Sequence, residues 1–360
     1  MSGPTPLADF HRANGAVFTG SFALPAHFGD PASEYAAARD AAGLIDLSDR
    51  ALLQFTGPDR LAFLQGMLSN DLRALHPFEG QYAAILTQQG KVVADVRALC
   101  AMNSFYLDFW GSLKEKVLAH LNRYLVADEV EIADRSSEYA FISVRGPRAE
   151  TLVQAAAAGA ALPAQTKQHA MIAIEGAAVC VVRENPGAPA YDLILPLASA
   201  PAIARQLTEA GKPLGAVWVG AEAQEILRIE AGIPRYGVDF SEDHLLLEAG
   251  LADAVSFTKG CYLGQEIVER VRSRGHVNRK LCGLLLDGAL AARPGDRLRA
   301  DDKQVGAVTS SALSPRYGRP LALGYVAKEF CQPDTVLTID RAGAAIRATV
   351  APLPFAPALE

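Results

Sequence analysis

The chain has 360 residues, of which half are apolar and about a fifth are charged, as in ordinary folded proteins. This length exceeds what one hydrophobic core usually organises, so we expect two or three domains. The net charge of −6 and the lack of any apolar run near the ~18 residues of a membrane span argue against a nucleic-acid or membrane partner.

Two pairs of segments in the first two-thirds of the chain repeat the same order of elements. Residues 51–65 predict an alternating strand, a Gly-Pro break and a helix, and residues 140–154 predict the same order. Further on, a strand followed by a helix over residues 106–118 matches another pair over residues 191–207. Two matched pairs in the same order predict two similar α+β lobes.

The segment 90–97 predicts a strand that carries a carboxylate. Strand alternation puts Val93, Asp95 and Arg97 on one face. Asp95 either pairs with Arg97 on a solvated face or points toward a bound ligand, and the pattern leaves both interpretations open.

A second carboxylate lies near the end of a predicted helix. Residues 221–232 predict a helix that ends at a glycine, and Glu230 follows Ile226 by four residues and Leu227 by three, on the apolar side. A carboxylate in that position must find hydrogen-bond donors or lose its charge. Glu230 is therefore a candidate ligand-binding group, and the alternative is a helix-terminal Glu that reaches solvent.

Residues 259–266, Lys-Gly-Cys-Tyr-Leu-Gly-Gln-Glu, are the most informative segment of the chain. The apolar residues after it have helical spacing, and Glu266 lies four residues before Arg270, where the two can form an ion pair. We expect Cys261 at or just before a helix start, beside Lys259, where backbone N–H groups and the helix dipole stabilise a thiolate. The segment therefore predicts a loop with the most reactive thiol of the chain or a site for an anionic group; a turn with a structural Cys is the alternative.

The last part of the chain changes character. Turn signals separate short apolar strands, which predicts a small antiparallel barrel or sandwich. The predicted strands cover residues 281–286, 305–310, 321–326, 336–339 and 346–350.

The cysteines and the N-terminus indicate a cytoplasmic protein. The five cysteines are odd in number and no pair has C-x-x-C spacing, so a disulfide framework, a zinc site and a cysteine-ligated cluster lack support. The first nine residues have neither the apolar core of a signal peptide nor the Arg-rich character of a transit peptide.

The motif at 259–266 resembles the signature of the YgfZ-type folate-binding proteins, relatives of the glycine-cleavage T-protein (aminomethyltransferase) that support iron–sulfur enzymes. Residues 11–16 and 43–48 resemble the opening of the T-protein, and residues 228–239 are similar to the segment before its folate pocket. Residues 305–315 resemble its C-terminal domain, so the resemblance covers nearly the whole chain.

The resemblance implies an α+β fold with two similar α/β lobes and a C-terminal antiparallel β-barrel, arranged around a central cavity that holds tetrahydrofolate. On this basis we expect the first lobe over residues 1–138, the second lobe, with the Lys-Gly-Cys-Tyr motif, over 139–280, and the barrel over 281–360.

The resemblance also implies a set of folate-binding residues. Glu230 matches the pterin contact of the T-protein, and Lys259 lies where the T-protein contributes a basic contact. Tyr236 belongs to the segment before the pocket. Arg274 lies in a cluster of basic residues between 270 and 280 that could receive the glutamate tail of folate, although a solvated helix face is equally consistent with that cluster.

The residues implied for chemistry are Cys261, Lys259 and Asp95. Where the T-protein has two adjacent aspartates, one of them its catalytic acid, this chain has Ala94 followed by Asp95. Half of that motif is missing, which weighs against an aminomethyltransferase.

The resemblance therefore implies a tetrahydrofolate-binding accessory protein for iron–sulfur cluster assembly or repair, including in radical enzymes that methylthiolate tRNA. Its partners would be a reduced folate and iron–sulfur client or scaffold proteins, with no direct contact to nucleic acid or membrane and no metal site of its own. The alternative is an enzyme, a folate-dependent aminomethyltransferase or demethylase, and a third interpretation is a binding module in which folate is only a structural ligand.

Overall fold

The computed structural model describes residues 5–19, 24–274, 277–341 and 344–355. The chain divides into two compact units. The first comprises residues up to 83 together with 94–224, and the second comprises residues 84–93 together with those from 225 onward. In the part of the chain described, no helix is long and apolar enough to cross a membrane.

The first lobe is built on a five-stranded sheet with the order β3-β4-β5-β2-β6. After β2 and β5 the chain continues into a helix, as the repeat predicts. The elements are β2 (Arg50–Thr56), α3 (Arg60–Met67), β3 (Gly80–Leu86), β4 (Val92–Cys100), β5 (Phe105–Trp110), α4 (Lys114–Tyr124) and β6 (Glu131–Asp134).

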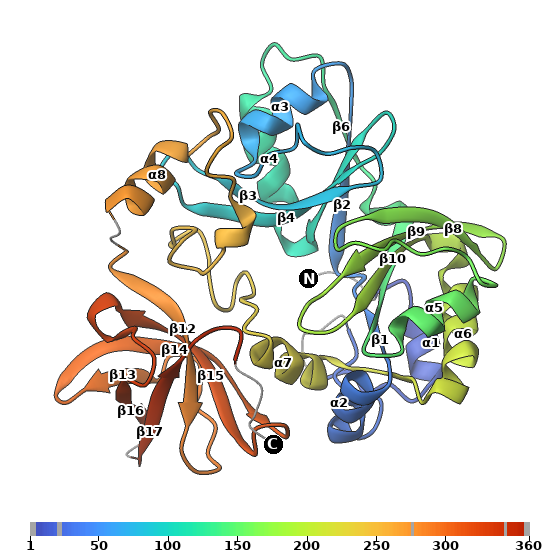
Figure 1. The fold of residues 1–360 in the computed structure, drawn as a ribbon. Coiled ribbons are helices and arrows are strands. Elements are labelled where there is room, and N and C mark those ends of the chain that lie inside the picture. Colours follow the sequence, from blue (N-terminus) through green and yellow to red (C-terminus); the bar gives the residue numbers. More distant parts are fainter. Residues whose placement is uncertain (1–4, 20–23, 275–276, 342–343, 356–360) are drawn as a thin grey trace. The chain divides into compact units, whose positions relative to one another are not determined.

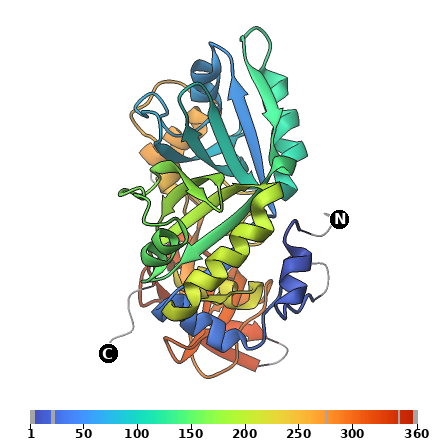
Figure 2. The ribbon, with the colours of Figure 1, turned by 90° about the vertical axis from the view of Figure 1, so that its right-hand side faces the viewer.

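The second lobe has a six-stranded sheet with the order β11-β1-β7-β10-β9-β8, and its helices α5 and α6 lie on one face of the sheet (Figure 2). Leu152 of α5 and Ile203 of α6 are fully buried in the core with Val144 and Leu193 from the sheet. The elements are β1 (Gly43–Asp46), β7 (Tyr139–Arg145), α5 (Ala149–Ala156), β8 (His169–Ile174), β9 (Ala177–Glu184), β10 (Ala190–Pro196), α6 (Ala200–Gly211) and β11 (Val217–Trp218).

The strand–helix repeat predicted from the sequence is thus confirmed, but one strand crosses the boundary expected at residue 138. All four residues of β1 are buried, and β1 pairs with β7 on one side and with β11 on the other. A strand from the start of the chain therefore belongs to the second sheet. Helices α1 (Ala8–Ala13) and α2 (Pro31–Asp40) precede it.

The C-terminal domain is a closed barrel of six strands in the order β12-β15-β14-β13-β16-β17 (Figure 1). The predicted antiparallel barrel is confirmed. The sequence pattern missed β13, in which Leu298 alone is apolar and fully buried. The strands are β12 (Arg279–Leu286), β13 (Arg297–Ala300), β14 (Lys303–Ser314), β15 (Arg319–Ala327), β16 (Val336–Arg341) and β17 (Ala344–Ala351).

The Lys-Gly-Cys-Tyr motif precedes helix α8 (Gln265–Arg274) in the second unit. Gly264 has a positive φ of 84°, and an added Cβ would lie 2.6 Å from the carbonyl oxygen of Thr87. Gly90, also at positive φ, would clash in the same way with Ile267 of α8. Only glycine fits this close approach, so the two glycines fix the start of α8 against the turn at 87–90.

Candidate functional site

Asp95 lies on β4, and its two carboxyl oxygens have different surroundings. The hydroxyl of Tyr82 donates a hydrogen bond to Asp95 Oδ2 at 3.0 Å. The other oxygen, Oδ1, is buried and has no hydrogen-bond partner among the described residues. Burial raises the pKa of Asp95, against the opposing effects of the Tyr82 hydrogen bond and the charge of Arg50. Perturbed carboxyl groups of this kind cluster at functional sites.

Arg97, two residues further along β4, is the centre of a buried ion cluster in the first unit. Its guanidinium pairs with Asp108 of β5, with Asp192 of β10 at 2.7 Å and with Glu184 of β9 at 2.8 Å. Asp108 also pairs with Arg50 of β2. The arginine side chain is only 6% exposed, so the cluster joins strands of both lobe sheets in the interior.

These contacts correct the interpretation of Asp95 and Arg97 as a pair on a solvated face. Burial acts to lower the pKa of Arg97, but its three carboxylates outweigh this and raise that pKa well above its ordinary value. Burial likewise acts to raise the pKa of Asp192, but Arg97 and Arg145 outweigh it and lower that pKa. The sequence missed this cluster because the partners are far apart along the chain.

Glu230 is the last residue of α7 (Ala221–Glu230) and is buried, with 8% of its surface exposed. The hydroxyl of Ser314, at the end of β14, donates a short hydrogen bond to Glu230 Oε1. Ser314 is itself buried and accepts a hydrogen bond from the backbone N–H of Tyr317 at 3.1 Å. The alternative of a helix-terminal Glu that reaches solvent is therefore wrong, and Glu230 is a buried carboxylate as its helical phase predicts.

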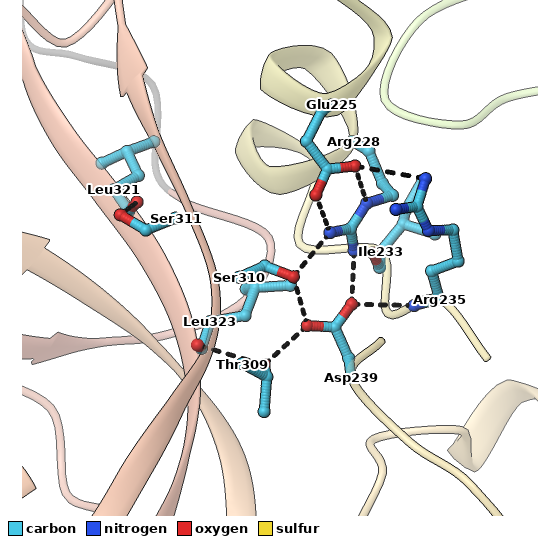
Figure 3. A network of polar contacts seen from close by, with 10 residues as sticks. All are labelled: Glu225, Arg228, Ile233, Arg235, Asp239, Thr309, Ser310, Ser311, Leu321 and Leu323. Carbon is cyan, nitrogen blue, oxygen red and sulfur yellow. Dashed lines mark hydrogen bonds and ion pairs between the residues drawn. The ribbon is translucent and has the colours of Figure 1, made fainter. Parts of the chain in front are cut away.

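A polar network around Arg228 fixes the end of α7 to the barrel (Figure 3). Arg228 donates to both oxygens of Glu225 at 2.6 and 3.0 Å, to Asp239 at 2.6 Å, to Ser310 at 2.7 Å and to the carbonyl oxygen of Ile233 at 2.6 Å. All five N–H donors of the guanidinium are thus used. The network holds the residues on either side of Glu230 in place.

Asp239 joins this network to the barrel strand β14. Its Oδ1 accepts hydrogen bonds from the hydroxyls of Thr309 and Ser310, both at 2.6 Å, and its Oδ2 accepts from the backbone N–H of Arg235 at 2.9 Å (Figure 3). Tyr236, the next residue, packs edge-to-face on Phe240 with ring centroids 5.3 Å apart. Tyr236 thus lies on a loop that a buried carboxylate holds rigidly.

The motif loop contains one exposed thiol and two buried polar side chains. Cys261 is exposed, whereas Lys259 and Tyr262 are each only 7% exposed. The Lys259 ammonium lies 5.1 Å from the centroid of the Tyr262 ring. The Tyr262 hydroxyl is buried without a hydrogen-bond partner in the described part of the chain, and burial raises its pKa to about 12. A buried hydroxyl that lacks a partner fits a loop that receives a polar ligand.

Helix α8 begins at Gln265, four residues after Cys261. The ion pair predicted between Glu266 and Arg270 is confirmed at 2.5 Å. Cys261 therefore lies in the loop before the helix rather than within its first turn. The side chain of Arg274 lies outside the described part of the structure.

A thiol with a lowered pKa, Cys331, lies in the barrel. A hydrogen bond with the Cys282 thiol lowers the pKa of Cys331 to about 7. Burial raises the pKa of Cys180 to about 12 and also raises that of Cys100. The expectation of a single activated thiol in the chain is therefore wrong, because Cys331 has a lowered pKa, and Cys261 is distinguished by its exposure.

The second unit contains Glu230, Tyr236, Lys259 and Cys261, whereas Asp95 and the Arg97 cluster lie in the first unit. Two α/β lobes and a closed C-terminal antiparallel barrel make up the chain. The model of the GCVT N-terminal domain matches residues 7–259, and that of the glycine cleavage T-protein C-terminal barrel domain matches residues 279–356. The chain belongs to the glycine-cleavage T-protein family.

Individual relatives cover almost the whole chain. It is 34% identical to an aminomethyltransferase of Rubrobacter xylanophilus, over 98% of this chain and 93% of that protein. It is 31% identical to an aminomethyltransferase of Cutibacterium acnes, over 98% and 97% of the two chains. The crystal structure of the glycine cleavage system aminomethyltransferase T from Bartonella henselae has the same fold, with a TM-score of 0.91, 24% identity and coverage of 99% and 98%.

Proposed function

We propose that this protein binds tetrahydrofolate and transfers a one-carbon unit to it from an aminomethyl donor. The observation that carries the proposal is the state of Asp95, a carboxyl group with a raised pKa, one oxygen held by Tyr82 and the other buried without a partner among the described residues. A raised pKa favours the protonated carboxyl group, which can donate a proton to a departing amine. The relatives named aminomethyltransferase support this assignment.

The residues of the second unit fit a reduced folate. Glu230 is a buried carboxylate at the end of a rigidly held helix, able to accept N–H groups of the pterin ring. The hydroxyl of Tyr262, which has no partner among the described residues, and the buried ammonium of Lys259 offer donors to the polar groups of the ligand. When bound, tetrahydrofolate supplies the nucleophilic nitrogen that takes up the carbon. Tyr236 and Arg274 are further proposed contacts.

An anaerobic partial-reaction assay tests the transfer. The purified protein is incubated with an aminomethyl-loaded carrier protein of the glycine-cleavage system and tetrahydrofolate. We expect release of ammonia and the appearance of the carbon on the folate at enzymic rates. Ammonia release no faster than in a protein-free control would contradict the proposal.

A second candidate is the folate-binding accessory role in iron–sulfur cluster assembly or repair. It is favoured by the exposed Cys261 in the Lys-Gly-Cys-Tyr-x-Gly-Gln-Glu motif and by Ala94 at the position of the second aspartate. In this role the bound folate and the thiol act on iron–sulfur client or scaffold proteins, with the radical tRNA-methylthiolation enzymes among the clients.

Replacing Cys261 with alanine separates the two candidates. As a transferase, the Cys261→Ala protein should keep its rate within about twofold, because the chemistry rests on Asp95. As an accessory protein, the same substitution should cause the loss of iron–sulfur enzyme activity that we expect on deletion of the gene. Measuring both in parallel assigns the function.

Folate should protect Cys261 from alkylation. With limiting iodoacetamide at neutral pH, we expect both Cys261, because it is exposed, and Cys331, because its pKa is lowered to about 7, to react before Cys180, whose pKa is raised to about 12. Saturating tetrahydrofolate should slow alkylation of Cys261 and leave Cys331 unchanged. Peptide mapping by mass spectrometry measures both rates. Equal slowing at the two cysteines would contradict the proposal that the motif loop is part of the folate site.

A further inference from the structure

Two free cysteines lie together in the C-terminal barrel, although 49 residues separate them in the sequence. Cys282 is on β12, and Cys331 directly follows the short helix η6 (Lys328–Phe330) after β15. Both side chains pack in the same core cluster of the barrel. Neither residue belongs to the motif loop or to the carboxylates proposed for folate transfer.

The strand pairing of the barrel explains how the fold brings the two thiols together. β12 and β15 are antiparallel neighbours, with Lys280 opposite Val326. The Cys282 sulfur lies 3.5 Å from the carbonyl oxygen of Lys280, and the Cys331 sulfur lies 3.1 Å from that of Val326. Both sulfurs therefore lie near Lys280 and Val326, which are opposite each other on the paired strands.

The two thiols have opposite properties. Cys331 is partly exposed, and the hydrogen bond from Cys282 lowers its pKa to about 7, so a substantial fraction is thiolate at neutral pH. Cys282 is only 6% exposed, and its pKa is raised by its hydrogen bond with Cys331 and by burial. An accessible thiolate beside a buried thiol is the arrangement in which one cysteine reacts with an oxidant and the other resolves the product.

We propose that Cys331 and Cys282 form a redox site in the barrel that reacts with hydroperoxides and closes to an intrachain disulfide. The Cys331 thiolate attacks one peroxide oxygen, the O–O bond breaks, and the alkoxide or hydroxide that leaves takes up a proton. Cys331 is then a sulfenic acid. The Cys282 sulfur attacks it, the S–O bond breaks, and the hydroxyl leaves as water with the proton of Cys282. In total, two thiols and one hydroperoxide give one disulfide, one alcohol or water, and one further water.

The test uses the reduced full-length protein, treated with equimolar hydrogen peroxide at pH 7 and then blocked with N-ethylmaleimide. With blocking carried out in denaturant, we expect two fewer maleimide adducts than in the untreated protein, and peptide mapping should give a fragment that joins Cys282 to Cys331. Cys331→Ser should abolish this fragment. Cys282→Ser should abolish it too and leave a sulfenic acid at Cys331 that dimedone traps. Cys180→Ser, at a half-buried thiol outside the barrel, is the matched control and should leave the cross-link intact.

A second measurement remains informative if the serine variants fold poorly. The alkylation rate of Cys331 in the wild-type protein should reach half its maximum near pH 7. Cys282→Ala removes the hydrogen bond, so this midpoint should rise toward the ~8.5 of an ordinary thiol. A Cys331 that oxidises no faster than Cys180, a disulfide that forms only between Cys261 residues of two molecules, or an unshifted midpoint in Cys282→Ala would each overturn the proposal.

Discussion

Asp95→Asn is expected to lower the rate of aminomethyl transfer to tetrahydrofolate by about 10²–10⁴-fold, the usual contribution of a positioned acid or base. Asparagine keeps the shape of the side chain and can still accept the hydrogen bond from Tyr82, but it cannot hold a transferable proton. Because burial raises the pKa of Asp95, the carboxyl group keeps its proton to a higher pH than an exposed aspartate. The rate of transfer should therefore fall as the pH rises through that pKa, and this pH dependence should be absent in Asp95→Asn.

The comparison requires a control for non-specific effects. Asp128→Asn makes the same change at an exposed position of the same lobe and should leave the rate unchanged. Single-turnover rates with saturating folate separate the chemical step from binding. If Asp95→Asn transferred the carbon as fast as Asp128→Asn, Asp95 would not be the acid, and the accessory role would become the better assignment.

The second large effect is on stability. Arg97→Met is expected to lower the free energy of unfolding by about 3–5 kcal/mol, because removing one partner of a buried ion cluster leaves uncompensated charges in the interior. Asp108 retains Arg50, but Asp192 and Glu184 lose their shared guanidinium. Urea unfolding followed by circular dichroism measures the difference. Arg205→Met, on the exposed side of α6, is the control and should change stability by less than about 0.5 kcal/mol.

This loss should depend on pH in a defined direction. The folded-state pKa of Asp192 is lowered below its ordinary value of 3.8, so its stabilisation is present above that value and is lost as the pH falls through the folded-state pKa. Without Arg97 the carboxylates can be protonated more easily. The difference in unfolding free energy between Arg97→Met and the wild-type protein should therefore become smaller in acid. A difference in unfolding free energy that stays constant from neutral pH to well below pH 3.8, or an Arg97→Met protein as stable as Arg205→Met, would show that the cluster does not stabilise the two lobes.

The sequence predicted those parts of the fold that depend on local signals. The Gly-Pro breaks after β2 and β7 mark the repeat of the two lobes, and turn residues mark most strands of the barrel. β1 could not be assigned to the second sheet because its pairing with β7 joins residues about a hundred positions apart in the chain. β13 was missed because its four residues contain a single leucine and no apolar alternation that would set it apart from a loop.

The same distinction holds for the candidate site. The burial of Glu230 follows from its position on the helix and was predicted correctly. Arg97 looked like a surface residue because its partners Glu184 and Asp192 are 87 and 95 residues away in sequence. The hydrogen-bonded pair of Cys282 and Cys331 was likewise invisible in the spacing of the cysteines, since only the closed barrel brings them together.

The central claim, that this chain binds tetrahydrofolate through Glu230, is tested most directly by anaerobic isothermal calorimetry. We expect the wild-type protein to bind tetrahydrofolate at one site. Glu230→Gln should weaken binding roughly tenfold to a hundredfold, since a charge-assisted hydrogen bond contributes about 1.5–3 kcal/mol. Glu222→Gln, the same change at an exposed position of α7, should bind as the wild type does. Equal affinities for the Glu230→Gln and Glu222→Gln proteins, or no binding by the wild type, would contradict the claim.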